Sequence, residues 1–199
     1  MTVRHAVLSA LLDADASGYQ LAKIFDVSVA NFWHAVPQQL YAELARLEAA
    51  GLLTGREVVQ ERRPNKRVFA ITDRGRAALR EFIAGPSRPS FIRDDLLVKV
   101  HAAEAGDVDA LVLELEERAA QAGARADLIN SQLARLRGEQ TEEQFLANSP
   151  RIGPYLTGMR GRQFETENAA WCTQAARILR ARTEHAAPHA KTPQNSTRR

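Results

Sequence analysis

The stretch PQQLYAELARLEAAGLL, residues 37–53, decides how the first half of this chain folds. Pro37 suits the first turn of a helix, where its missing N–H is not needed. Three leucines follow at the spacing of a single helical stripe: Leu40, Leu44 and Leu47. Gly51 stands where a helix C-terminal glycine belongs. The sequence therefore predicts a helix that starts at Pro37, stops just before Gly51 and turns one leucine stripe inward.

The opposite face of this helix is suited to contact DNA. It carries three alanines and one cation, Arg46, with Gln38 and Gln39 near its start and Tyr41 to one side. Amides and guanidinium groups hydrogen-bond base edges, and alanines let the backbone approach the groove. We therefore predict a recognition helix whose DNA-binding residues are Gln38, Gln39, Tyr41 and Arg46.

Two short strands are predicted after this helix, at residues 53–60 and 67–71, because both runs are β-branched and partly alternating. The turn between them is polar, and four of the six residues from 62 to 67 are cationic. The DNA-binding candidates of this segment are Arg62, Arg63, Asn65, Lys66 and Arg67. A helix followed by a basic hairpin is the outline of a winged helix-turn-helix. The alternative is an amphipathic helix beside a solvated turn, but the order of the two features favours DNA binding.

Two helices are predicted before this segment, at residues 3–12 and 18–25. Ser17 caps the second of them, and its N-terminal amides together with Tyr19 are candidates for a phosphate contact. Tyr19 could instead simply pack against the protein. Trp33, in the connection that follows, either packs on the core or faces an effector. Further on, Thr72 caps a fourth helix that runs to about residue 84, and the loop GPSRPS at 85–90 is the natural domain boundary.

The runs PQQLYAELARLEAAGLL and RRPNKRVFAITDRGRAALREFI resemble the PadR family of bacterial transcriptional regulators. The recognition-helix pattern of the family is filled by Tyr41, Leu44, Leu47, Glu48, Gly51 and Leu52. The wing pattern and the helix after it are filled by Arg63, Pro64, Lys66, Arg67, Phe69, Thr72, Gly75 and Leu79. The likeness extends to the SGYQL run at 17–21 and, more loosely, to the second half, so that it covers about residues 6–179.

The second half is helical by pattern. A helix at 91–103 has four candidate inward residues: Ile92, Leu96, Leu97 and Val100. A long helix at 107–137 carries an apolar seam: Leu111, Leu115, Ala119, Ala122, Ile129, Leu133 and Leu136. Glycines and prolines punctuate the next segment, and a last helix is expected at 163–182. Residues 183–199 have no apolar periodicity and are expected to be disordered.

Long helices with narrow apolar stripes enclose little core alone, so this half is predicted to dimerise. The candidate dimerisation residues share one face of the last helix: Phe164, Trp171, Ala175 and Ile178. The resemblance also implies a homodimerisation domain, of the virulence-activator type. A monomeric hairpin folded onto the first domain is the alternative. The expected fold is mainly α, with a winged helix-turn-helix domain at 1–85 and an all-helical dimerisation domain at 86–182.

Composition and motifs limit which other classes of protein are possible. Net charge is only +3, but residues 56–80 hold eight basic and three acidic side chains, so the basic charge is local. One cysteine excludes an internal disulfide and suits a reducing cytoplasm. No signal sequence or apolar run near 20 residues occurs, so neither secretion nor membrane binding is expected. The histidines lack metal-ligand spacing, and no phosphate loop or nucleophile elbow occurs, so we expect no enzyme, no metal and no cofactor.

Two function classes remain. The first, which the resemblance implies, is a homodimeric repressor that binds a pseudo-palindromic DNA operator and is relieved by a small aromatic or hydrophobic effector. The second is a winged-helix protein-interaction module that does not read DNA. Because such a module need not retain the four cations between residues 62 and 67, the wing favours the first class. The sequence leaves the operator, the effector and the direction of regulation open.

Overall fold

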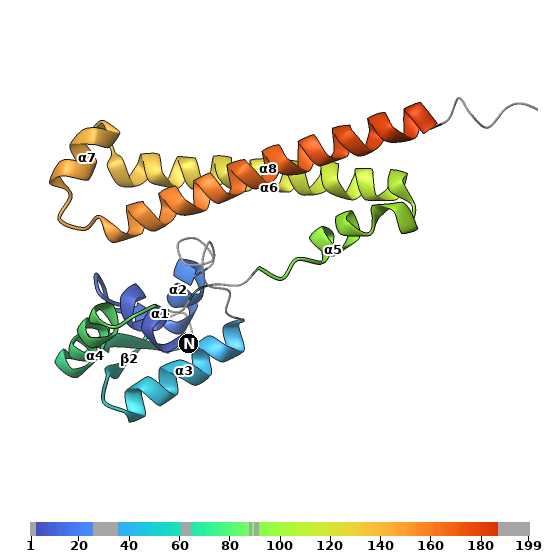
Figure 1. The fold of residues 1–199 in the computed structure, drawn as a ribbon. Helices are drawn as coiled ribbons and strands as arrows, with labels where there is room; N and C mark the ends of the chain where they lie inside the picture. Colours follow the sequence, from blue (N-terminus) through green and yellow to red (C-terminus); the bar gives the residue numbers. More distant parts are fainter. Residues whose placement is uncertain (1–2, 26–35, 61–64, 88, 90–91, 187–199) are drawn as a thin grey trace, which may run out of the picture. The chain divides into compact units, whose positions relative to one another are not determined.

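The computed structural model describes residues 3–25, 36–60, 65–87, 89 and 92–186. Its contacts divide the chain into two compact units, Met1–Ser90 and Phe91–Arg199. Unit 1 holds four described helices and a small sheet, and the described part of unit 2 is helical (Figure 1). The mainly α fold, with a winged helix followed by a helical domain, is confirmed. The interpretation of Trp33 and most of the predicted disordered tail at 183–199 lie outside the described residues. Residues 183–186 belong to the last helix, so the prediction of disorder was wrong for them.

Unit 1 is built around the helix that the opening stretch predicts. This helix is α3 (Pro37–Ala49), and Gly51 follows it with a φ of 68°, the left-handed conformation that glycine tolerates. The three stripe leucines are buried. They share one core with residues from α1 (Val3–Ala10), α2 (Gly18–Ile24) and α4 (Asp73–Ala84). Leu11 and Leu12 lie beyond the end of α1, so the prediction of a helix to residue 12 was two residues too long.

The wing belongs to a three-stranded sheet with the order β1-β3-β2. Strands β2 (Leu53–Val58) and β3 (Lys66–Ile71) pair antiparallel, and β2 ends two residues before the predicted end. The two-residue strand β1 (Ala16–Ser17) pairs with the other edge of β3, and this strand was not predicted. Because β1 pairs with the wing strand β3 and leads directly into α2, it connects the wing to the second helix.

Unit 2 is dominated by a hairpin of two long helices, α6 (Val108–Arg137) and α8 (Gly153–Ala186), which lie side by side (Figure 1). Three short helices accompany them: α5 (Asp95–His101), the 3-10 helix η2 (Ala103–Ala105) and α7 (Glu142–Asn148). No helix among the described residues is both long and apolar enough to span a membrane.

The seam between the long helices contains two apolar clusters. One surrounds Leu115 and Cys172 near α5, and the other surrounds Leu133 and Tyr155 near α7. Most of the predicted seam of α6 is buried or partly buried, but Leu136 is exposed. The inward prediction was also wrong for Ile92 and Leu97, which are exposed. The helix predicted at 91–103 is α5, only seven residues long, so Ile92 lies before it. Within α5, Leu96 is buried and Val100 partly buried, whereas Leu97 faces solvent.

The last helix begins ten residues before its predicted start, at Gly153, so several of the glycines that suggested an interrupted segment lie inside it. Gly153 and Pro154 form its first turn, where proline is tolerated. Gly158 is buried, and a Cβ at this position would lie 2.7 Å from Leu133 Cδ2. Gly158, one of the glycines that suggested an interrupted segment, therefore lets α8 approach α6 closely.

Two other glycines provide a matched test of whether the space around a glycine decides the effect of adding a Cβ. A Cβ on Gly75 would overlap the backbone carbonyl oxygen of Leu52, whereas a Cβ on Gly123, in α6, would meet nothing within 4 Å. We expect Gly75→Ala to lower the free energy of unfolding by about 1–3 kcal/mol, because backbone must move. Gly123→Ala should raise it by roughly 0.5–1 kcal/mol through helix propensity. Urea denaturation of both variants checks this, and equal effects of the two would contradict it.

Candidate nucleic-acid interface

The start of α2 is held in place by its own side chains. Ser17 Oγ accepts a hydrogen bond from the Gln20 backbone N–H at 3.3 Å, and Gln20 Oε1 accepts one from the Ser17 N–H at 2.9 Å. This capping box fixes the turn that precedes Tyr19. Tyr19 is 64% exposed, with Lys23 Nζ 4.9 Å from its ring centroid. Tyr19 therefore projects into solvent beside a cation and does not pack in the core.

Tyr41 positions α3 against α2. A Cβ on Gly18 would overlap the Tyr41 ring, so the ring lies directly on the Gly18 backbone. Half of the Tyr41 side chain remains exposed. Gly18 thus sets the spacing between α2 and α3. The outer edge of the Tyr41 ring remains accessible to a ligand.

The outward face of α3 has the predicted character. Gln38, Gln39 and Arg46 are exposed, as are the alanines between them. Arg46 Nη1 lies 3.4 Å from Glu43 Oε2, but the Arg46 side chain is far more exposed than that of Glu43. The helix therefore presents amides, alanines and one guanidinium to solvent and largely covers its acids.

Only some of the DNA-contact residues predicted in the wing lie among the described residues. Arg62 and Arg63 lie outside them. Lys66 is half-buried at the start of β3. Asn65 donates from Nδ2 to Glu57 Oε1 at 3.0 Å and accepts from the Gln60 N–H at 3.4 Å. Its amide therefore closes the base of the turn, a structural role that the sequence did not indicate.

Arg67 also has a partner inside the protein. Its Nη2 lies 2.7 Å from Glu48 Oε1, in α3. This hydrogen bond, together with the Glu48 charge, raises the pKa of the Arg67 guanidinium. Glu48 was identified only as part of the family pattern. The signal that could have found its role is Gly55, because a glycine inside a strand indicates a close approach.

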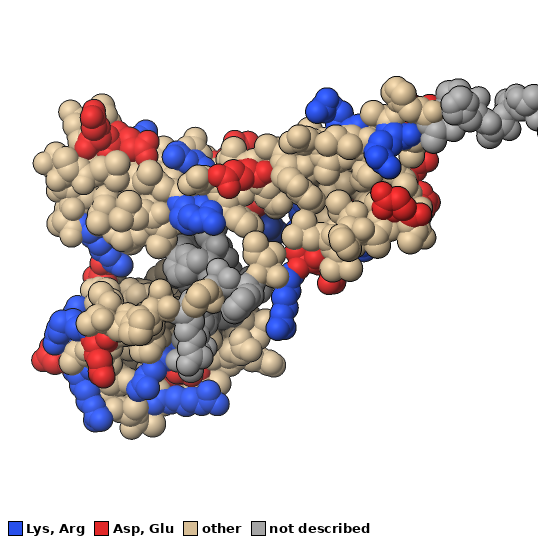
Figure 2. Space-filling model, in the orientation of Figure 1, with Lys and Arg blue, Asp and Glu red and all other residues tan. Residues whose placement is uncertain are grey.

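Unit 1 carries exposed cations on its surface. Arg56 Nη2 lies 3.5 Å from Asp15 Oδ2 and remains mostly exposed. Several other Lys and Arg side chains project from the surface of unit 1 (Figure 2). These exposed cations can contact a polyanion, although Asp and Glu side chains lie among them on the face shown in Figure 2.

Unit 2 presents the predicted dimerisation residues on its surface. Phe164, Trp171 and Ile178 are 45%, 39% and 47% exposed. Ala175 is half-buried and packs against the seam cluster around Cys172. Leu156 is also exposed. At about 100° per residue, Leu156, Phe164, Trp171 and Ile178 fall within one stripe about 80° wide, which faces away from the Cys172 side of the helix.

These features define a class of protein. Two helices in fixed contact, the second with an exposed amide face, and a basic hairpin joined to them by a shared sheet make a winged helix-turn-helix DNA-binding unit. Residues 7–81 match the transcriptional regulator PadR-like family, and residues 92–180 match the virulence activator alpha C-terminal family. The chain is therefore a PadR-like transcriptional regulator with a C-terminal region of the virulence-activator type.

Similar proteins agree with this assignment. The chain is 40% identical over 125 residues to the probable transcriptional regulator Rv1176c of Mycobacterium tuberculosis, covering 58% of this chain and 66% of that protein. It is 24% identical over 176 residues to the negative transcriptional regulator PadR of Bacillus subtilis, covering 85% and 92%.

Solved structures share its fold. The B. subtilis PadR structure in complex with operator DNA has a TM-score of 0.74 at 20% identity, over 89% of this chain and 97% of that one. The same protein with p-coumaric acid has a TM-score of 0.67 at 19% identity, over 90% and 99%. The Vibrio cholerae virulence activator AphA has a TM-score of 0.65 at 25% identity, over 91% and 99%.

The exposed face of α3 makes a prediction about base readout. We expect Gln38→Ala to relax the preference at one operator position by roughly 1–3 kcal/mol, because an amide can make a bidentate base contact. Arg46→Ala, nearer the helix end, should weaken binding to all sequences alike through a lost phosphate contact. Binding to a set of single-base operator variants measures both. Indistinguishable preference profiles for the two variants would contradict the division of roles.

Proposed function

We propose that this chain is a homodimeric repressor whose two recognition helices read a pseudo-palindromic operator in double-stranded DNA. The observation that carries the proposal is the outward face of α3, with its amides exposed and its acids covered, beside a basic wing. The relatives named negative transcriptional regulator and solved with operator DNA support it. A protein with this function acts where the DNA is, in the cytoplasm.

The apolar stripe of α8 supports the homodimer. The hairpin of α6 and α8 encloses only two small clusters, and the stripe of Leu156, Phe164, Trp171 and Ile178 remains in solvent. A second copy of the same stripe would bury these side chains in an isologous contact. Trp171, as the largest of them, would contribute most area. A two-fold dimer then places equivalent half-sites about one helical turn of DNA apart.

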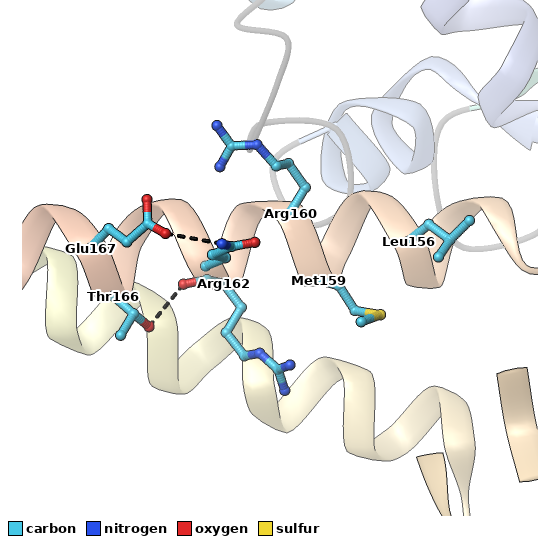
Figure 3. Close-up of a pocket in the computed structure, with 7 residues that line it drawn as sticks. Leu156, Met159, Arg160, Arg162, Thr166 and Glu167 are labelled. Atoms are coloured by element: carbon cyan, nitrogen blue, oxygen red, sulfur yellow. Dashed lines mark hydrogen bonds between the residues drawn. The ribbon is translucent and has the colours of Figure 1, made fainter. Parts of the chain in front are cut away.

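A groove on α8 is the proposed effector site (Figure 3). It has a volume of about 570 Å³ and is lined by apolar Leu156 and Met159, by Arg160 and Arg162, which point to opposite sides of α8, and by Gln163, Thr166 and Glu167. Apolar surface beside a guanidinium group suits a small aromatic acid, and Arg160 is the candidate for that contact because Arg162 donates a hydrogen bond to Asn130 Oδ1 at 3.2 Å. The B. subtilis protein solved with p-coumaric acid supports this ligand class. Because the groove borders the stripe at Leu156, a ligand that favours one dimer geometry over another would change operator affinity.

The dimer predicts the behaviour of a charge placed in the stripe. Trp171→Glu should convert the protein to a monomer and remove most operator affinity, since two half-sites are then no longer bound together. Leu113→Glu is the matched control: Leu113 is exposed on α6 and is not part of the stripe on α8, and its substitution should leave both properties unchanged. Sedimentation velocity and gel-shift titration measure the outcome. A Trp171→Glu protein that remains dimeric would place the contact elsewhere.

The wing predicts a change in salt dependence. Replacing Arg63 and Lys66 together by Gln should lower the slope of log affinity against log salt concentration by about two, because each cation neutralises about one phosphate. Arg135→Gln with Arg177→Gln, both exposed in unit 2, provides the control with an equal loss of charge. Fluorescence anisotropy at several salt concentrations gives the slope. An unchanged slope with binding intact would exclude the wing from the DNA contact.

A further inference from the structure

Glu48 joins three elements of unit 1 through one oxygen atom. Its Oε1 accepts a hydrogen bond from the Gly55 backbone N–H in β2 at 3.0 Å and another from Arg67 Nη2 in β3 at 2.7 Å. Glu48 itself lies in the last turns of α3. A single carboxylate oxygen therefore connects the recognition helix to both strands of the wing.

Gly55 makes this connection sterically possible. A Cβ at this position would lie 2.5 Å from Glu48 Oε1 and 2.6 Å from Arg67 Nε, closer than real Cβ atoms come to other groups. Glycine inside a strand costs stability, because it adds no packing and loses more chain entropy. Here its small size leaves room for the carboxylate against the strand backbone and for the guanidinium beside it.

The geometry also bears on what Arg67 does. Its side chain is 57% exposed, and that of Glu48 is 29% exposed, so the ion pair adds little stability by itself. The ion pair instead affects the orientation of the wing strands relative to α3. The leucine stripe already fixes the rotation of α3, whereas β2 and β3 extend as a two-stranded ribbon beyond the short strand β1. The Glu48 contacts hold the strands of that hairpin against the helix.

We propose that Glu48 and Arg67 form a clamp that sets the angle between recognition helix and wing, and that Arg67 acts as a positioning residue and not as a phosphate contact. The inference rests on the proposed DNA binding and assigns a different role to one of the cations that the sequence placed at the DNA. Helix and wing must reach the same duplex at once, so a fixed angle favours the correct operator over other DNA.

The test compares Glu48→Gln, Arg67→Gln and the double variant in the full-length chain. The DNA upstream of its own coding region is the specific probe, and a scrambled duplex of equal length is the non-specific one. Each single variant should lower the ratio of specific to non-specific affinity about tenfold, as expected for a lost charge-assisted hydrogen bond. The double variant should be no worse than either single one, because the residues act as a unit. The salt slope should stay unchanged.

Two controls separate the clamp from general effects. Arg56→Gln removes an exposed cation of β2 that pairs with Asp15. Any phosphate contact of Arg56 would be made with both duplexes, so the ratio should stay unchanged. Arg67→Lys retains a donor for Glu48 and should recover most of the ratio. Amide hydrogen exchange at Gly55 should accelerate in Glu48→Gln without DNA present, because the N–H loses a charged acceptor.

Two results would overturn the clamp. Arg67→Gln could lower the salt slope by about one while Glu48→Gln binds as well as the wild type or better, which would make Arg67 a phosphate contact. Arg56→Gln could also lower the ratio as much as Arg67→Gln. A wild-type chain that binds neither duplex would instead refute the proposed function, while the exchange rate of Gly55 would still report on the clamp.

Discussion

Burial of the leucine stripe on α3 is the constraint on which the DNA-binding unit depends. Leu40, Leu44 and Leu47 are almost completely removed from solvent, and each contributes on the order of 1.5–3 kcal/mol by burial. A rotation of α3 by one residue, about 100°, would expose leucines and bury amides, so the orientation of the helix is strongly determined. The outward position of Gln38 and Arg46 is the consequence of this inward packing.

The wing depends on a second, less obvious constraint. A two-stranded hairpin is marginal on its own, and the third strand, β1, makes β3 central in the sheet. Because β1 is the residue pair that runs into the capping box of α2, the same strand supports the wing and the second helix. Helix α3 meets this sheet through Glu48 and meets α2 through Tyr41 on Gly18. The two DNA-facing elements are thus parts of one framework.

Local signals predicted most helices and both strands of the wing, but they did not predict the contacts between these elements. Leucine periodicity predicted α3, and Ser17 and Thr72 predicted the caps of α2 and α4, because these depend on neighbours along the chain. The strand β1 has only two residues and exists through pairing with β3, so no local pattern reveals it. The partner of Arg67 lies 19 residues away in sequence, and its identity follows only from the fold. For the same reason, an exposed arginine in a basic run was assigned to DNA.

The hairpin of unit 2 gives a physical reason for the proposed homodimer. Its long helices approach closely where small residues such as Gly158 and Ala122 face the seam, and this close approach leaves a thin core. A thin core cannot also cover large side chains on the outer face, so Trp171 and Phe164 stay exposed. If a partner covers them, the spacing of two recognition helices becomes a property of unit 2. Sequence reading by α3 and ligand binding near Leu156 are then linked through the same interface, although neither site needs to contact the other.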